Sequence, residues 1–340
     1  MKRCLTCIAG AVVIAGVGGL SIAGLGLVDV GAASGHYAMT EWVLHSVMRA
    51  SVRTAAIGIE APKTRAPESG MTIAAVHFER ACSTCHGSPR RKQSPDVLAM
   101  LPPPPDLSQS IGSWSAEELF VIVRDGIRYT GMPAWPATHR DDEVWTMVAF
   151  LRKLPGLDPA GYSNLLNARH IQKGRSCAQC HDGKNALAPN FQNQSEIYLR
   201  NSLTGYLEGK RSSGIMQVVV AGMDLQEIAN ITGEYSKTAR NCRHIGTASA
   251  PTLVVEGDEV RKIPACNGCH DGKRPDYPVL DGLPAAYIAT QLALFRGGNR
   301  VESVNQERMA FAARNLTDED MWLVSKHFSS QAPLNSACEE

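Results

Sequence analysis

Several stretches of the chain carry apolar side chains at the three- to four-residue spacing of an amphipathic helix. Residues 37–53 form one such stretch, and residues 141–154 form another, which Pro155 ends. Ser115 and Glu118 have the spacing of a capping box and mark the start of a further helix. The pattern therefore predicts a series of short helices.

The N-terminal region differs from this pattern, because residues 8–28 carry no charged side chain. A run of this length can span a bilayer, and Lys2 and Arg3 before it favour a cytoplasmic N-terminus. A cleaved signal peptide is the alternative, since the small residues at 31–34 could form a processing site. The run is longer than the usual signal core, so we expect residues 1–34 to form an uncleaved membrane anchor.

Residues 35–70 are expected to form an amphipathic helix followed by a linker. Trp42, Arg49 and Arg53 would suit a helix that lies at the membrane interface or packs on a partner subunit. Packing against the first folded domain is an equally weighted alternative.

Three copies of a Cys-x-x-Cys-His motif follow. The thiols are Cys82, Cys85, Cys177, Cys180, Cys266 and Cys269, and the adjacent histidines are His86, His181 and His270. Two thiols on one turn can each add to a vinyl group of one haem, and the histidine can ligate the iron from the same side. Zinc would need its ligands in sets of four, whereas these clusters stand far apart in the chain. The motifs predict three covalently bound haems c.

Composition sets wider bounds on the chain. Its 340 residues are enough for three small domains, which we expect at residues 71–157, 162–238 and 250–331. Domains of this size have thin apolar cores, so we expect the protein without haem to fold poorly. Lys and Arg (34) nearly balance Asp and Glu (33), which gives no global field that would indicate a nucleic acid partner.

The cysteines also indicate a compartment. Haem attachment takes place outside the cytoplasm, so the motifs predict haem domains in the periplasm, held at the inner membrane by the anchor. Cys242 and Cys338 could pair as a disulfide, or they could be two unrelated thiols. Cys4 and Cys7 have the spacing of a haem motif but no histidine follows them, so we expect no haem there.

Each iron also needs a second axial ligand. Met132 lies in a Gly-Met-Pro-Ala loop near the end of the first domain and is the ligand predicted there. A thioether opposite histidine favours ferrous iron and suits electron transfer. The spare histidines do not occupy such loops, and they are His36, His45, His77, His139, His170, His244 and His327.

The second and third domains form an internal repeat with an offset of 89 residues. Tyr198 and Tyr287, Gly209 and Gly298, and Arg211 and Arg300 are among the pairs that share this offset. Met309 precedes Leu316, at the start of the last helix, by seven residues, and the same count back from Met223 reaches Met216. We therefore predict Met216 and Met309 as ligands and Met223 as a packing residue, with a four-residue deletion in the second domain.

The second and third domains resemble class I cytochrome c domains of the diheme c4 and c553 type. The resemblance rests on the haem motifs, the downstream proline, the paired tyrosines, Gly-x-Arg and Leu-Thr-Asp-Glu-Asp before the last helix. The first domain resembles membrane-bound cytochromes that carry Pro-Pro-Asp-Leu and Thr-Gly-Met-Pro-Ala-Trp. The resemblance implies an all-α fold with three tandem class I cytochrome c domains behind an N-terminal transmembrane helix.

The layout also resembles the triheme cytochrome subunits of bacterial membrane-bound dehydrogenases. This resemblance implies a relay through three His/Met haems, with no catalytic residue in this chain. Electrons would come from a molybdenum, quinoprotein or flavoprotein subunit and pass to ubiquinone or a terminal oxidase. A freestanding membrane-tethered carrier, or a haem enzyme with one labile axial methionine, are the alternatives.

Overall fold

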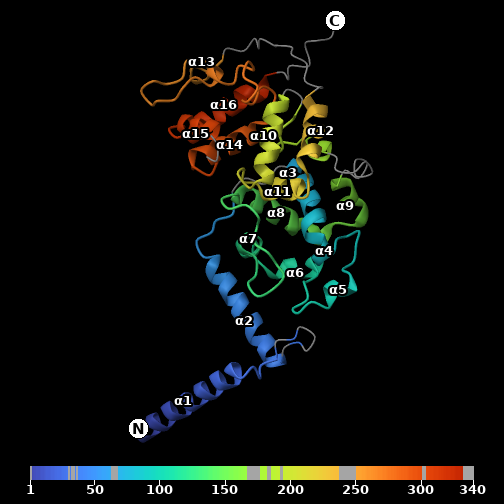
Figure 1. The fold of residues 1–340 in the computed structure, drawn as a ribbon, viewed down its shortest axis with the longest axis vertical. Helices are drawn as coiled ribbons and strands as arrows, with labels where there is room; N and C mark the ends of the chain where they lie inside the picture. Colours follow the sequence, from blue (N-terminus) through green and yellow to red (C-terminus); the bar gives the residue numbers. More distant parts are fainter. Residues whose placement is uncertain are drawn as a thin grey trace.

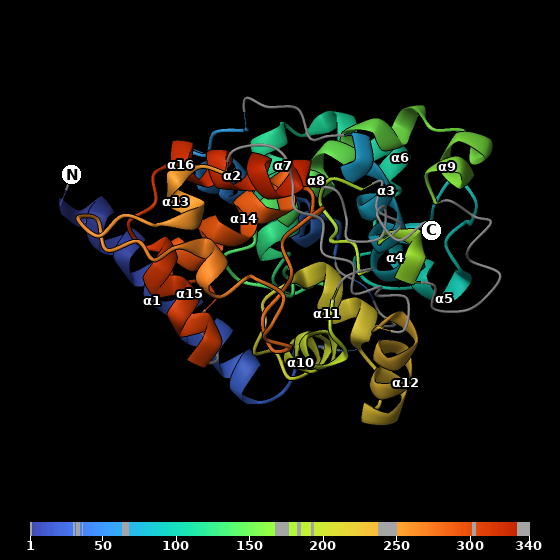
Figure 2. The same ribbon diagram turned by 90° about the horizontal axis from the view of Figure 1, so that it is seen from above.

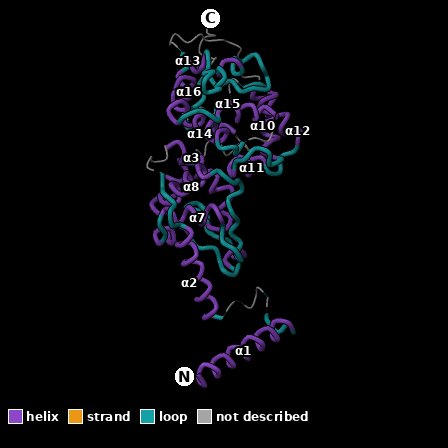
Figure 3. The backbone as a smooth tube through the Cα atoms, turned by 90° about the vertical axis from the view of Figure 1, so that its left-hand side faces the viewer, coloured by secondary structure: helices purple, strands orange, loops and turns teal. Residues whose placement is uncertain are grey.

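The fold is described from a computed structural model of the chain. It describes residues 2–29, 31, 35, 37–62, 68–166, 177–181, 185–191, 194–236, 250–300 and 304–331. Within these ranges the secondary structure is helical, without β-strands (Figure 3). The all-α fold class is confirmed for this part of the chain. Cys242, Cys338, His36, His170 and His244 lie outside the described residues.

The helices are short after the first two. The first half holds α1 (Lys2–Gly24), α2 (Ala38–Ala55), α3 (Glu68–His77), α4 (Ser83–His86), α5 (Pro95–Leu98), α6 (Leu107–Ser110), α7 (Ala116–Asp125), α8 (Asp141–Lys153) and α9 (Pro159–Leu165). The second half holds α10 (Glu196–Leu207), α11 (Gly214–Val220), α12 (Leu225–Ser236), α13 (Thr252–Val255), α14 (Ala285–Arg296), α15 (Val304–Ala313) and α16 (Asp318–Ser330). The predicted helix at 141–154 and the Ser115–Glu118 capping box are confirmed by α8 and α7.

The N-terminal helix α1 lies apart from the body of the molecule (Figures 1 and 3). Among the described residues, no helix combines the length and the apolar character that a bilayer span requires. The predicted anchor at residues 1–34, and with it the location at the inner membrane, is therefore wrong. An uncharged run was a poor guide here because α1 is rich in glycine and alanine, whose small side chains contribute little apolar surface.

The amphipathic helix predicted near residue 40 is confirmed as α2, which packs against the segment around α7. The guanidinium of Arg49 lies 4.6 Å from the centre of the Trp114 ring. Nε of Arg53 lies 3.6 Å from Oε1 of Glu118. Of the three predicted settings for this helix, the structure therefore shows the contact with the first folded region.

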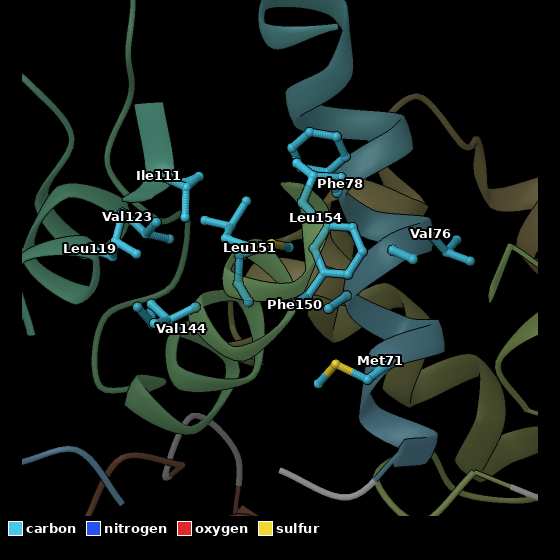
Figure 4. Close-up of a cluster of buried hydrophobic side chains, with 14 of the residues drawn as sticks. Met71, Val76, Phe78, Ile111, Leu119, Val123, Val144, Phe150, Leu151 and Leu154 are labelled. Carbon is cyan, nitrogen blue, oxygen red and sulfur yellow. The ribbon is translucent and has the colours of Figure 1, made fainter. Parts of the chain in front are cut away.

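The first core is the largest and is built by α3, α7, α8 and α9. Figure 4 shows Met71 and Phe78 from the α3 segment facing Phe150 and Leu154 from the α8 segment. Tyr162, from α9, is fully buried in the same cluster although it lies in the range predicted for the second domain. The predicted domain boundaries stay a prediction.

The internal repeat is confirmed by the helix bounds. Helices α10 and α14 begin and end 89 residues apart, whereas α12 and α16 begin 93 residues apart. The difference is the four-residue deletion predicted from the register of the methionines. In each repeat the first helix packs on the last one, and the two sets lie beside each other in Figures 1 and 2.

His77, at the end of α3, makes the stability of the first core depend on pH. Its side chain is 4 % exposed, its ring centre lies 4.8 Å from that of Trp135, and Nδ1 has no hydrogen-bond partner. Burial lowers the pKa of His77 from 6.5 to about 4. Because the folded state disfavours the protonated ring, stability is fully present above pH 6.5 and is lost as the pH falls toward 4.

Replacing His77 with phenylalanine is expected to remove this pH dependence. The pKa difference corresponds to roughly 3 kcal/mol of unfolding free energy between pH 7 and pH 4. Denaturant unfolding of the first core at both pH values measures it, and His45→Phe on the exposed face of α2 is the control. If H77F and H45F lost the same unfolding free energy between pH 7 and pH 4, His77 would not be the source of the pH dependence.

Candidate haem sites

All three motif histidines make the same contact. Nδ1 lies 2.9 Å from the Pro105 carbonyl oxygen in His86, 2.7 Å from that of Pro189 in His181, and 2.8 Å from that of Pro278 in His270. A carbonyl oxygen can only accept a hydrogen bond, so Nδ1 carries the proton in each ring. Nε2 is then the ring nitrogen that carries a lone pair, which is the form that ligates a metal, and the chain itself orients the ring.

Tight turns bring each pair of thiols together. Cys82 ends a π-helical turn, Phe78–Cys82, whereas the other two motifs begin in 3-10 turns, Cys177–Gln179 and Cys266–Gly268. Burial raises the pKa of Cys82 to about 12 and that of Cys266 to about 11, and the neighbouring cysteine adds to each rise. The reactive thiolate is therefore disfavoured once these segments are packed.

The third motif opens onto a cavity of about 920 Å³. Cys266, Cys269, His270 and Met309 all line it, so the structure brings the four residues predicted for one haem together. Nε2 of His270 is buried without a hydrogen-bond partner. An imidazole nitrogen in this state, facing an apolar cavity beside two thiols, fits an iron ligand.

The second motif lines a smaller cavity, of about 200 Å³, together with Met216 and Met223. Met223 is buried in a core cluster with Val220 and Ile228, and Met216 packs against that cluster from a partly buried position. This agrees with Met223 as a packing residue, but both residues line the cavity. Met216 as the ligand stays a prediction.

In the first domain, Met132 lies half-buried in the loop between α7 and α8. Its carbonyl accepts a hydrogen bond from the Ile127 backbone N–H at 3.1 Å. Gly126, with φ of +66°, passes so close that a Cβ there would lie 2.7 Å from the Met132 carbonyl oxygen. The loop is thus firmly held, while its approach to His86 stays a prediction.

A buried cluster of arginines and tyrosines between the two cavities was recognised in the sequence only as part of the repeat. Arg211 lines both cavities, and Arg300 lines the larger one. Arg211 donates from Nη2 to the Tyr287 hydroxyl at 3.1 Å, and Arg300 donates to the side-chain oxygen of Gln291. The signal that could have found the cluster is an arginine at the same position of both repeats.

The charges of this cluster have no carboxylate partner within the described part of the chain. Arg211 and Arg300 are 5 % and 8 % exposed, and among the described residues neither guanidinium is paired with an acidic side chain. Burial and the nearby charge of Arg211 lower the pKa of Arg300, whose Nε is buried without a partner. Burial alone would raise the pKa of Tyr198, but the two guanidinium charges outweigh it and the pKa is lowered.

Buried cations beside a cavity call for an anion. Haem carries two propionate carboxylates, so the second and third sites offer what the group needs: thiols, an oriented imidazole, apolar walls and positive charge. The residues present therefore fit haem c.

Comparisons with known proteins agree with this chemistry. Residues 70–151 match the family model of cytochrome c oxidase, cbb3-type, subunit III. Cytochrome c4 of Pseudomonas aeruginosa is 30% identical over 172 residues, which cover 46% of this chain and 83% of that protein. The thiosulfate dehydrogenase electron acceptor of Stutzerimonas stutzeri is 29% identical over 170 residues, covering 46% and 78%. A solved structure of Acidithiobacillus ferrooxidans cytochrome c4 is 26% identical, covers 43% of this chain and 90% of its own, and has a TM-score of 0.37.

The cysteine pairs with their oriented histidines define a c-type cytochrome. On its similarity to Pseudomonas cytochrome c4, the chain belongs to the cytochrome c family, in its c4-like class. It is an electron-transfer protein that binds haem c. The predicted resemblance to class I, c4-type domains is confirmed.

Proposed function

We propose that this chain binds three haems c and passes electrons along them in chain order, between a dehydrogenase and a downstream acceptor. The observation that supports this proposal best is the set of residues that line the cavity at Cys177 and His181. The lining includes Ile73 and Thr146 from the first part of the chain and Gln291 from the third part. The three parts are the ranges predicted as domains, residues 71–157, 162–238 and 250–331. A cofactor in that cavity would touch residues from all three predicted domains, which supports the second haem as the middle step of the relay.

The proposed ligand sets follow the motifs. Haem c supplies reversible one-electron transfer between ferric and ferrous iron. The chain would hold it through Cys82, Cys85, Cys177, Cys180, Cys266 and Cys269, with axial pairs His86 and Met132, His181 and Met216, and His270 and Met309. The equal displacement of 93 residues between Met216 and Met309 and between α12 and α16 supports the second and third pairs.

The two c4-like parts are joined by direct contacts that would keep their haems in register. Gln194 donates from Nε2 to the Val279 carbonyl at 2.8 Å and accepts from the Val279 N–H at 3.2 Å. Arg211 reaches Tyr287 across the same boundary. Both segments also border the cavities, so the contacts that fix the interface also fix the distance between the two sites.

A dehydrogenase is the proposed electron donor. Relatives from Stutzerimonas stutzeri and Thiomonas intermedia are named electron acceptors of thiosulfate dehydrogenase, which supports a donor of this general kind. Its redox centre could be molybdenum, a quinone cofactor or a flavin, and ubiquinone or a terminal oxidase would take the electrons onward. A freestanding carrier that serves several partners is the second candidate, since the relatives include free c4 cytochromes.

Two measurements test this proposal on the matured protein. Mass spectrometry is expected to show the mass of three haems on the chain, and the reduced protein is expected to bind no carbon monoxide, because methionine closes each iron. Fewer than three haems would overturn the relay. A carbon monoxide complex at one site would instead indicate the haem enzyme with a labile methionine. Partner complexes that dissociate in moderate salt would favour the freestanding carrier.

A further inference from the structure

The carboxylate of Glu143, on α8, is buried at the boundary between the first and second parts of the chain. It is 6 % exposed. Oε2 accepts hydrogen bonds from the Trp135 ring N–H at 3.1 Å and from the Gly214 backbone N–H at 2.7 Å. Oε1 accepts from the Ser213 hydroxyl at 2.5 Å and lies 2.7 Å from Nη2 of Arg140. One carboxylate thus collects donors from both sides of the boundary.

The donors belong to the two segments that carry proposed iron ligands. Trp135 follows Met132 by three residues in the same loop. Ser213 is the N-cap of α11, and its hydroxyl accepts the backbone N–H of Met216 at 3.1 Å. A continuous set of hydrogen bonds therefore runs from the Met132 loop through Glu143 to the backbone of Met216.

The boundary has no room for this set to rearrange. A Cβ on Gly214 would overlap the indole ring of Trp135. Arg140, held by Asp142 on one side, donates to the Ser212 carbonyl at 2.8 Å, and the Ser212 hydroxyl donates to the Thr138 carbonyl at 3.2 Å. The glycine, the serine pair and the ion pair make this contact specific to one relative placement of the two parts.

We propose that Glu143 is a positioning residue that locks the Met132 loop and the N-terminus of α11 to each other, and so sets the environment of the first and second haems together. The effect on the haems rests on the proposed function, whereas the lock itself rests only on the hydrogen bonds around Glu143. With glutamine in place of the carboxylate, one of the two acceptor oxygens becomes an N–H donor that faces other buried donors, and the Arg140 charge loses its counterion. α11 would then be free to shift against the loop.

The variant that tests the lock is Glu143→Gln, with Asp141→Asn as its matched control. Asp141 is an exposed carboxylate in the first turn of the same helix and lines neither cavity. In the matured protein, E143Q is expected to increase amide hydrogen exchange at Gly214 and Met216 at least tenfold. It is also expected to shift the potentials of two haems and leave the third unchanged. D141N is expected to do neither.

A second variant reaches the same contact from the other side. Gly214→Ala displaces Trp135 and should reproduce both effects, whereas Gly233→Ala, where an added Cβ meets nothing within 4 Å, should not. Exchange and potentials in E143Q and G214A that match those of D141N and G233A would overturn the lock. Hydrogen exchange at Gly214 and Met216 tests the lock independently of the number of bound haems. A protein with fewer than three haems would therefore contradict the proposed relay and leave the lock unaffected.

Discussion

Replacing Cys177 and Cys180 together by alanine is expected to unfold the middle of the chain, a larger loss of structure than the same change causes at either other motif. Among the described residues, the core cluster of the second repeat, beside Met216, has three buried members, Val220, Met223 and Ile228, and Cys180 of the second motif packs on the edge of the first core. Burying three such side chains contributes roughly 5–9 kcal/mol. Ordering each residue of the backbone costs about 1–2 kcal/mol, so this region requires the apolar surface of its haem.

The segments that follow the other two motifs build larger cores of their own within the described part of the chain. The cluster that Cys266 packs against has twelve buried members, and the one that Cys82 packs against, and that Cys180 contacts at its edge, has nineteen. The expected order of damage is therefore second motif, then third, then first. In the third region, the cavity of about 920 Å³ would be left without its occupant, whereas the first core packs largely against itself.

Hydrogen exchange of the three double variants, read by segment, measures this order. Residues 194–236 should lose protection in the C177A/C180A protein while residues 71–154 keep theirs. The Cys82 and Cys85 double variant serves as the control for the loss of one haem without loss of the middle region. Equal protection of residues 194–236 in both proteins would show that their fold does not depend on the second haem.

Local signals made much of the fold predictable. Ser115 and Glu118 of the capping box lie within one helical turn, so both partners can be read from the sequence, and α7 starts there. The 89-residue offset between the haem motifs also separates the bounds of α10 and α14, because an internal repeat repeats its helices. The proline that follows the second and third motifs also marked a real contact, since its carbonyl orients the histidine in each case.

Contacts between residues that are far apart in the sequence could not be predicted from it. Glu143 and Ser213 are 70 residues apart, and nothing in either segment indicates that they meet. Tyr162 lies beyond the boundary predicted for the first domain, yet its hydroxyl donates to Glu79, beside the first haem motif, at 2.8 Å. The prediction of a membrane anchor was wrong for a different reason. Residues 8–28 lack charge, but their many glycine and alanine side chains give them too little apolar surface.

The buried arginines are expected to raise the potentials of the second and third haems. A nearby positive charge favours the iron state that carries less positive charge, which is the ferrous state. Arg211 and Arg300 have no carboxylate among the described residues to offset their charge within the chain. At about 10 Å and an effective dielectric constant of about 20, one charge contributes roughly 1.7 kcal/mol, or about 70 mV for one electron.

Arg211→Gln is therefore expected to lower the potentials of both the second and the third haem, because Arg211 lines both cavities, and Arg300→Gln is expected to lower mainly that of the third. The potential of the first haem should stay where it is. Arg296→Gln is the matched control, since Arg296 lies near the surface and its charge is paired with Asp318 at 2.7 Å. Spectroelectrochemical titration of the four proteins gives the shifts. Unchanged or raised potentials in R211Q would contradict the prediction that the charge of Arg211 raises the potentials of the second and third haems.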